Sequence, residues 1–223
     1  MDWNEWEPWY ERIVSDLGLD RSRDIESARL LGQLLERHDG DIQAFDDLLR
    51  GKSVIIIGPA PFHETDFGDA VIVSAGSATE QLILGGIMPD VIVTDLDGNV
   101  RAQVKARSSG ALAVIHAHGD NMPALREWVP RFRSPVMGTT QVKPFGKLQN
   151  FGGFTDGDRA VFLAMHFGAR HISLVGFDFD NPVVKPGGDI SLKRKKLAYA
   201  RDLIEYAMAK HGCIEIGNEP GKV

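Results

Sequence analysis

Two carboxylates follow a short apolar run in the segment 89–99, which reads Pro-Asp-Val-Ile-Val-Thr-Asp-Leu-Asp-Gly-Asn. The run Val91 to Val93 is typical of a buried parallel strand, and Asp95 and Asp97 stand at its carboxyl end. Ligands of open α/β sheets bind beside that end of the strands. Residues two apart share one face of an extended chain, so we expect these carboxylates to lie together. Such a pair repels unless a cation lies between, and Mg²⁺ prefers oxygen ligands.

A third carboxylate is predicted from the segment 152–159, which reads Gly-Gly-Phe-Thr-Asp-Gly-Asp-Arg and leads into an amphipathic helical pattern. Thr155 or Asp156 is a good N-cap for that helix, but capping explains only one polar residue of this segment. We therefore expect Asp156 to complete a metal site with Asp95 and Asp97. The alternative at the first pair is a strand-end turn in which Asp97 only caps a helix that begins near Gly98.

Glycines and small polar residues follow nearly every predicted strand, which favours a nucleotide site along one edge of the sheet. Glycine lets backbone N–H groups approach phosphates closely. The positions expected to contact a nucleotide are Gly58, Pro59, Ser74, Ala75, Gly76, Gly138, Thr139 and Thr140. A tight strand-to-loop turn is the alternative at Gly58, because the chain carries neither a Walker loop nor a dinucleotide fingerprint. A plain turn is also the alternative at 139–141.

Two further groups of side chains suit contacts with a polar or phosphorylated ligand. His116 and His118 precede Asp120, but no cysteine or further histidine stands at zinc-ligand spacing, so polar contacts at the mouth of a site are favoured over zinc. The dense basic run 193–196 is either a solvated helix face or a set of phosphate contacts. It follows Gly187-Gly188, which we expect to form a mobile loop.

The elements that must position these residues form an α/β pattern from residue 51 onward, in which apolar runs alternate with helical stretches. Strands are predicted at 54–57, 70–73, 91–93, 112–115, 136–137, 172–175 and 214–216. Helices are predicted at 79–84, 100–107, 122–128, 158–167 and 191–211. This order predicts a Rossmann-like, mostly parallel sheet flanked by helices, in an α/β catalytic domain of residues 51–223.

Residues 1–50 are predicted to form an N-terminal helical segment of their own. One apolar stripe recurs there at helical spacing, and it consists of Trp3, Trp6, Tyr10, Ile13 and Leu17. We expect the stripe to pack on the body of the protein or on a second subunit, and the second arrangement would give a homodimer. A second helix is predicted from residue 24 to residue 38, ended by Gly40, and a third at 42–49.

The composition is that of an ordinary globular protein, with 43% hydrophobic and 25% charged residues among 223. The net charge of −6 and the lack of a basic stripe argue against nucleic-acid binding. No apolar run is long enough for a membrane span, and the acidic N-terminus is not typical of a signal peptide. The single cysteine, Cys213, cannot form an internal disulfide and is expected in the core, which favours a cytoplasmic location.

Five motifs occur in order along residues 50–216: Pro89-Asp90, Asp95-Leu96-Asp97, His118-Gly119-Asp120-Asn121, the segment 153–159, and Gly176-Phe177-Asp178-Phe179. Together they resemble the archaeal 6-hydroxymethyl-7,8-dihydropterin pyrophosphokinases, which share a fold with thiamin pyrophosphokinases. In the latter, an Asp-Phe-Asp-Ser motif and a later Thr-Asp bind Mg²⁺. Asp95 and Asp97 match the first motif, with Leu and Gly in place of Phe and Ser, and Asp156 matches the second. The two departures argue against thiamin as the substrate.

The resemblance implies transfer of pyrophosphate from ATP to the hydroxymethyl group of the reduced pterin, with release of AMP, in tetrahydromethanopterin or folate biosynthesis. Asp95, Asp97 and Asp156 would hold one or two Mg²⁺, and Asp120 or Asp97 would accept the hydroxyl proton. Lys193 and Arg194 would close over the phosphates. The residues that would hold the pterin are His118, Asn121, Gln141, Asn150, Phe177 and Asp178, with Phe177 or Phe151 stacked on its ring.

Two other hypotheses stay open for this sequence. The same broad family includes motility-associated proteins that resemble sugar-nucleotide glycosyltransferases and share the Gly-Pro and His-Gly-Asp-Asn features. In such a protein, Asp95 and Asp97 would serve a nucleotide-sugar diphosphate. The third hypothesis is a non-catalytic nucleotide-binding module. Only the pyrophosphokinase converts ATP to AMP in a manner that depends on an acceptor.

Overall fold

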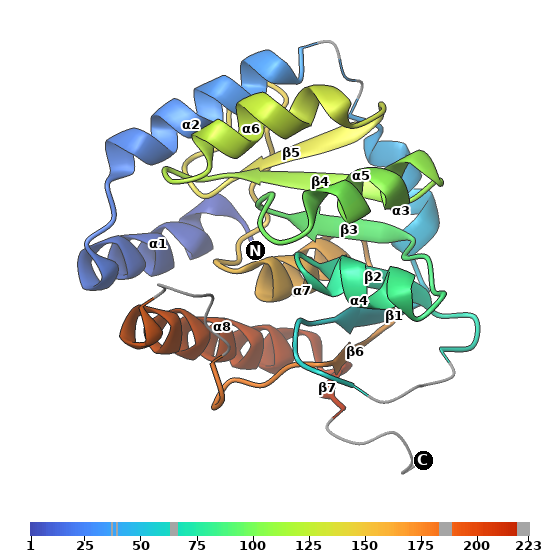
Figure 1. Ribbon diagram of the computed structural model, residues 1–223. Coiled ribbons are helices and arrows are strands. Elements are labelled where there is room, and N and C mark those ends of the chain that lie inside the picture. The colour runs from blue at the N-terminus through green and yellow to red at the C-terminus, as the bar shows by residue number, and fades with distance from the viewer. Residues whose placement is uncertain (37, 39, 63–66, 183–188, 218–223) are drawn as a thin grey trace.

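A parallel sheet forms the centre of the protein, in a computed structural model that describes residues 1–36, 38, 40–62, 67–182 and 189–217 (Figure 1). The strand order is β5-β4-β3-β2-β1-β6-β7, and each neighbouring pair is parallel. The strands are β1 Ser53–Ile57, β2 Val71–Ala75, β3 Val91–Thr94, β4 Leu112–Ala117, β5 Val136–Thr140, β6 His171–Val175 and β7 Ile214–Ile216. The predicted α/β fold is confirmed, and the described sheet is parallel throughout.

Helices connect the strands and cover both faces of the sheet (Figure 1). They are α1 Trp3–Leu17, α2 Arg21–Leu34, α3 Ile42–Leu49, α4 Ala78–Leu84, α5 Val100–Ser108, α6 Met122–Trp128, α7 Asp156–His166 and α8 Ile190–His211, with a short 3-10 turn at Val129–Arg131. None of the described helices combines the length and the apolar composition that crossing a bilayer needs.

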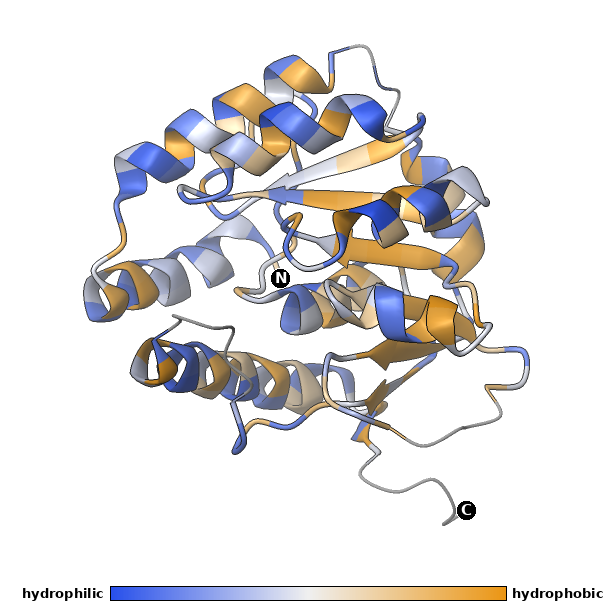
Figure 2. Cartoon of the chain, in the orientation of Figure 1, coloured by the Kyte–Doolittle hydropathy of each residue, from blue (hydrophilic) through white to orange (hydrophobic). Residues whose placement is uncertain are grey.

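Most of the strands are apolar on both faces, as a sheet covered on both sides requires (Figure 2). Along β2, Val71 and Val73 join the core that includes α7, whereas Ile72 packs with Leu82 of α4 on the other face. Along β3, the middle residue Ile92 likewise packs with α5. Because parallel strands end at one edge, the loops that follow β1, β2, β3, β4 and β6 gather there.

The N-terminal helices pack on the body of the same chain. Trp6, Tyr10 and Ile13 of α1 are fully buried and belong to one hydrophobic core with the sheet and α7. The predicted apolar stripe is therefore confirmed as a packing face. Helix α2 contacts β4 and β5 and lies beside α6 (Figure 1).

Several predicted boundaries are wrong in detail. Helix α2 begins at Arg21, because the Asp20 side chain caps it by accepting from the N–H of Ser22, and it ends at Leu34 rather than near Gly40. Cys213 is exposed and precedes β7, so its predicted place in the core is wrong. The predicted loop at 187–188 lies outside the described residues.

Candidate active site

Two buried polar side chains hold the loop that follows β3 and carries Asp95. Thr94 Oγ1 accepts a hydrogen bond from the N–H of Leu96 and donates one to Gln103 Oε1, at 2.8 and 3.0 Å. Gln103 Nε2 also donates to the carbonyl oxygen of Asp97 at 2.9 Å. Because Thr94 and Gln103 are fully buried, the interior of the protein determines the path of this loop.

Asp95 and Asp97 do not share one face of an extended chain, so that expectation is wrong. The strand ends at Thr94, and Leu96 has a φ of +65°, which side-chain-bearing residues rarely adopt. The chain turns at this point, and Asp95 Oδ1 accepts a hydrogen bond from the N–H of Asp97 at 3.0 Å. Asp97 is exposed, and Asn99 rather than Asp97 caps α5. Metal binding by Asp97 stays a prediction.

Asp156 lies in the first turn of α7 and faces the loop that follows β2. Thr155 is the N-cap of α7 and Asp158 completes a capping box, so the helix start does not depend on Asp156. A Cβ atom on Gly76 would lie only 2.6 Å from Asp156 Oδ2, and Gly76 has a φ of +53°. Glycine therefore suits this position, because a larger residue would displace the carboxylate and strain the backbone.

The carboxyls of Asp95 and Asp156 form one electrostatic unit. Burial raises the pKa of Asp156 well above its usual range, and the charge of Asp95 raises it further, although Arg159 opposes both effects. Burial also acts to raise the pKa of Asp95, but the hydrogen bond and charge of His118 and the charge of Arg159 outweigh it and lower that pKa. Two neighbouring acids whose pKa values move apart in this way are typical of a functional site.

Arg159 is the buried cation of this site, and sequence reasoning gave it no role. Its Nη1 atom lies 3.3 Å from Asp156 Oδ1, and its side chain is 4% exposed. Nη2 donates to the carbonyl oxygens of Phe154 and Gly153 at 3.0 and 3.4 Å. The signal that pointed to it was its place three residues after Asp156 on a predicted helix, where side chains meet.

The loop 118–121 follows β4 and brings His118 to Asp95. His118 Nε2 lies 3.5 Å from Asp95 Oδ2. The N–H of Asp120 donates to His118 Nδ1 at 3.4 Å, which favours the tautomer that carries its proton on Nε2. The Asp120 side chain is exposed and lies 3.8 Å from Arg23 Nη1. His118 is thus the predicted substrate residue that most directly contacts the carboxylate site.

Three amides predicted to contact the pterin make hydrogen bonds inside the protein. Asn121 Nδ2 donates to the carbonyl oxygens of His116 and Asp95 at 2.7 and 2.8 Å. Gln141 Nε2 donates to Asp24 Oδ2 at 2.7 Å, and Asn150 Nδ2 donates to a carbonyl oxygen at 3.0 Å. Contacts of these amides with a substrate stay predictions, and each would require rearranging the bonds described here.

The strand order reverses between β1 and β6, where open sheets bind their ligands. Gly58 and Pro59 follow β1 at this point, and Phe177 and Asp178 follow β6. The Phe177 ring packs against Gly58, because a Cβ atom there would lie 2.9 Å from the ring. Asp178 accepts the N–H groups of residues 180 and 181, both at 3.0 Å, and so forms a surface turn.

Five other predicted nucleotide residues lie within strands. Ser74 and Ala75 end β2, and Ser74 Oγ lies 2.9 Å from Thr79 Oγ1 in the interior. Gly138, Thr139 and Thr140 belong to β5, so the alternative of a plain turn is wrong at 139 and 140, whereas Gln141 follows the strand in a bend. A Cβ atom on Gly138 would lie 2.5 Å from the Leu35 side chain, which indicates close packing at that position.

The basic run lies in the first turns of α8, which packs on α7. Lys193 is half-buried and Arg194 is exposed, whereas Lys195 Nζ donates to the carbonyl oxygen of Asp16 at 3.3 Å. Lys196 was not predicted as a site residue, yet its Nζ lies 6.0 Å from the centre of the Phe154 ring, beside the Asp156 segment. Lys193 and Lys196 lie three residues apart on one helix face, and this spacing was visible in the sequence.

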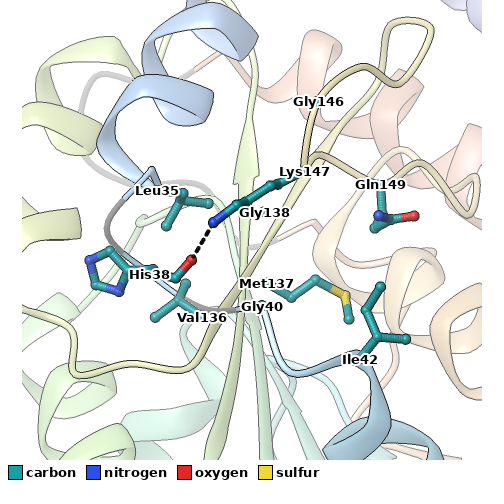
Figure 3. A pocket seen from close by; sticks show the side chains of 10 residues that line it. All are labelled: Leu35, His38, Gly40, Ile42, Val136, Met137, Gly138, Gly146, Lys147 and Gln149. Carbon is teal, nitrogen blue, oxygen red and sulfur yellow. Dashed lines mark hydrogen bonds between the residues drawn. The ribbon is translucent and has the colours of Figure 1, made fainter.

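A cavity of about 350 Å³ lies elsewhere, at the start of β5 (Figure 3). Its lining includes His38 and Lys147, and Lys147 Nζ donates to the carbonyl oxygen of His38 at 3.3 Å. It is lined by Val136 to Gly138 rather than by the last residues of the strand. The cavity is thus not the carboxylate site.

The donor set of the carboxylate site suits one kind of metal ion. Among the described residues, no three His, Cys, Asp or Glu side chains gather closely enough to hold a metal on their own. Mg²⁺ does not need such a cage, because it is bound by one or two carboxylates together with substrate phosphates and water. Asp95 and Asp156 supply that number of carboxylates. Burial and, after it, the charge of Asp95 raise the pKa of Asp156, and a cation between the two carboxylates would offset their repulsion.

His116 in β4 is a buried base beside this site. Its Nδ1 atom lies 3.1 Å from Thr139 Oγ1. Burial lowers the pKa of His116 well below its usual range, and the charges of Arg159 and His118 lower it further. The folded protein therefore holds His116 in its neutral form.

We expect His116 to make the protein less stable in acid. The unfolded chain binds a proton at this histidine below about pH 6.5, whereas the folded chain does not, so stability is full above that pH and falls below it. Between pH 7.5 and pH 5.5 this amounts to about 1.4 kcal/mol. Urea unfolding of the wild type and of His116→Asn should show the stability difference between them shrinking by that amount as the pH falls. A difference that is the same at both pH values would contradict the prediction.

Comparison with known proteins gives a consistent result. A family model described as 6-hydroxymethylpterin diphosphokinase MptE-like matches residues 41–183. The chain is 41% identical to the 6-hydroxymethyl-7,8-dihydropterin pyrophosphokinase of Methanothermobacter thermautotrophicus, over 97% of this chain and 99% of that protein. It is 43% identical to the protein of that name from Pyrococcus furiosus, over 92% and 94%, and 36% identical to that from Methanocaldococcus jannaschii, over 94% and 97%.

Proposed function

Because the chain belongs to the 6-hydroxymethylpterin diphosphokinase MptE-like family, we propose that it transfers pyrophosphate from ATP to the hydroxymethyl group of 6-hydroxymethyl-7,8-dihydropterin. The observation that carries the proposal is the likeness to three pyrophosphokinases of that name, which extends over more than nine-tenths of each chain. The carboxylates of Asp95 and Asp156 at the carboxyl edge of the sheet support it, because pyrophosphoryl transfer needs charge neutralised beside the phosphates.

In the proposed reaction, the pterin hydroxyl oxygen attacks the β-phosphorus of ATP. A new oxygen–phosphorus bond forms, the bond from the β-phosphorus to the oxygen that bridges it to the α-phosphorus breaks, and AMP leaves with that oxygen. The hydroxyl proton passes to a base, for which Asp97 and Asp120 are the exposed carboxylates beside the site. Such transfer depends mainly on positioning and on electrostatic stabilisation.

The residues of the site divide this work. Asp95 and Asp156 would hold Mg²⁺, which when bound supplies charge neutralisation at the phosphate oxygens. His118 orients Asp95 through its Nε2 atom, and Arg159 holds Asp156 at the start of α7. Lys196 of α8 lies over the Phe154 ring beside the Asp156 segment, and we propose that it contacts the phosphates together with Lys193, three residues earlier on the same helix.

AMP release is the direct test of this proposal. We expect purified protein with ATP, Mg²⁺ and the reduced pterin to form AMP and pterin diphosphate in equal amounts. Chromatography of the reaction mixture would measure both products. Reactions without acceptor, with thiamin, or with EDTA in excess of Mg²⁺ should form no AMP. Formation of ADP in place of AMP, or AMP formation that does not depend on the pterin, would overturn the proposal.

A further inference from the structure

Asp24 of α2 is a buried carboxylate that the reaction proposed above does not use. It is 3% exposed and accepts three hydrogen bonds. Tyr10 Oη and Gln141 Nε2 donate to its Oδ2 at 2.6 and 2.7 Å. The N–H of Gly119 donates to its Oδ1 at 2.7 Å. Burying a carboxylate is costly, and these three donors offset the cost.

The bond to Gly119 joins α2 to the loop that carries His118. A Cβ atom on Gly119 would lie 2.8 Å from the Arg23 side chain, so the loop backbone lies directly against α2. One turn further along α2, Ser27 Oγ donates to Asn121 Oδ1 at 3.2 Å. Helix α2 thus contacts the loop 118–121 near the start of the loop, at Gly119, and at the end of the loop, at Asn121.

The same loop connects to Asp95 at two points. His118 Nε2 lies 3.5 Å from Asp95 Oδ2, and Asn121 Nδ2 donates to the Asp95 carbonyl oxygen at 2.8 Å. A displacement of the loop would therefore move the partners of both the side chain and the backbone of Asp95. Partners of this kind are known to change metal affinity or activity by about 10- to 100-fold when they are lost.

We propose that Asp24 is a positioning residue of the active site, which acts through Gly119 to hold His118 and Asn121 against Asp95. This inference rests on the proposed function, and it extends the site to helix α2, outside the residues 41–183 that the family model matches. The N-terminal helical segment then contributes to the chemistry of the sheet edge and not only to the core.

Three variants separate positioning from stability. Asp24→Ala removes the acceptor of the Gly119 N–H. Asp24→Asn keeps one acceptor oxygen for that N–H and presents an amide to Tyr10 and Gln141, so it is the conservative substitution. Tyr10→Phe removes one donor to the same carboxylate but leaves the loop contact in place, which makes it the matched control for lost stability.

We expect Asp24→Ala to lower kcat for AMP formation about 10- to 100-fold and to raise the Mg²⁺ concentration for half-maximal activity. Asp24→Asn should restore most of both, and Tyr10→Phe should leave both within about twofold of the wild type despite unfolding at a lower urea concentration. Equal losses in Tyr10→Phe and Asp24→Ala, or full activity in Asp24→Ala, would overturn the inference.

Amide hydrogen exchange provides a readout that does not depend on activity. The N–H of Asp97 donates to Asp95 Oδ1, so its exchange reports on Asp95. We expect faster exchange of this N–H in Asp24→Ala, and in Gly119→Ala should Asp24→Ala fail to fold, but not in Tyr10→Phe. Unchanged exchange of the Asp97 N–H in Asp24→Ala, or in Gly119→Ala where that variant takes its place, would overturn the inference. A wild type that forms no AMP overturns the proposed function instead, and the exchange experiment then still decides this one.

Discussion

Asp95→Asn is expected to lower the rate of pterin-dependent AMP formation by about a thousandfold at saturating ATP and Mg²⁺. The carboxylate is the group that both His118 and the charge of Arg159 hold in its ionised form, so its loss removes negative charge where the proposed cation would bind. Removal of one electrostatic contact to a transition state costs about a hundredfold to a thousandfold in kcat. Initial rates of AMP formation across a range of Mg²⁺ concentrations would measure the effect.

The control for Asp95→Asn is an equivalent change at a residue that is not part of the proposed site. Asp202 is exposed on α8, and Asp202→Asn should leave the rate within about twofold of the wild type. The fold should survive Asp95→Asn, because the amide can still accept the N–H of Asp97 and repulsion from Asp156 is removed. Full activity in a folded Asp95→Asn variant would contradict the proposed role of Asp95 as a metal ligand.

Arg159→Met is expected to destabilise the protein by about 3–5 kcal/mol, the cost of leaving one partner of a buried ion pair alone. Asp156 would then lie at the start of α7 without its cation, and the carbonyl oxygens of Gly153 and Phe154 would lose a donor. Methionine retains most of the buried volume, so the loss would report on charge and hydrogen bonding. Urea unfolding at pH 7.5 would measure the change.

A second substitution identifies the cause of that loss. Because the destabilisation comes partly from unpaired charge on Asp156, adding Asp156→Asn to Arg159→Met should recover at least about 1 kcal/mol. The same double variant should stay inactive, since it lacks a carboxylate of the proposed metal site. If the double variant loses as much stability as Arg159→Met and Asp156→Asn lose together as single variants, the two side chains do not interact.

The sheet and the placement of two carboxylates were predictable because they follow from local patterns. Each apolar run forms a strand whose bounds lie within a few residues of the predicted ones. A strand that is buried on both faces needs a nearly continuous apolar sequence, which is easy to recognise. Asp95 and Asp156 came to the same edge because parallel strands and the helices that follow them end and begin there. Thr155 and Asp158 also fit a pattern that can be recognised in the sequence, an N-cap residue followed three residues later by its capping-box partner.

The remaining features depend on contacts between distant residues, which spacing does not encode. The buried hydrogen bonds that Thr94 makes with Leu96 and Gln103 hold Leu96 in a left-handed conformation. The chain therefore turns before Asp97, which the prediction had placed on an extended strand. The spacing of Arg159 and Asp156 on one helix was visible in the sequence, but the effect of the Arg159 charge on Asp95, which lies on another element, was not. Asp24 showed no pattern of its own, because its donors come from α1, from the loop after β4 and from the residue after β5.

The docking of α1 and α2 on the ends of β4 and β5 also bears on how the chain folds. Trp6 Nε1 donates to the Gln141 carbonyl oxygen at 2.8 Å, across a sequence separation of 135 residues, and Asp24 meets Gln141 across 117. Contacts between residues so far apart form slowly, because a long loop must close before they gain any energy. Helices made first during synthesis would therefore have to wait for strands made much later, and the catalytic edge would be among the last parts of the molecule to become ordered.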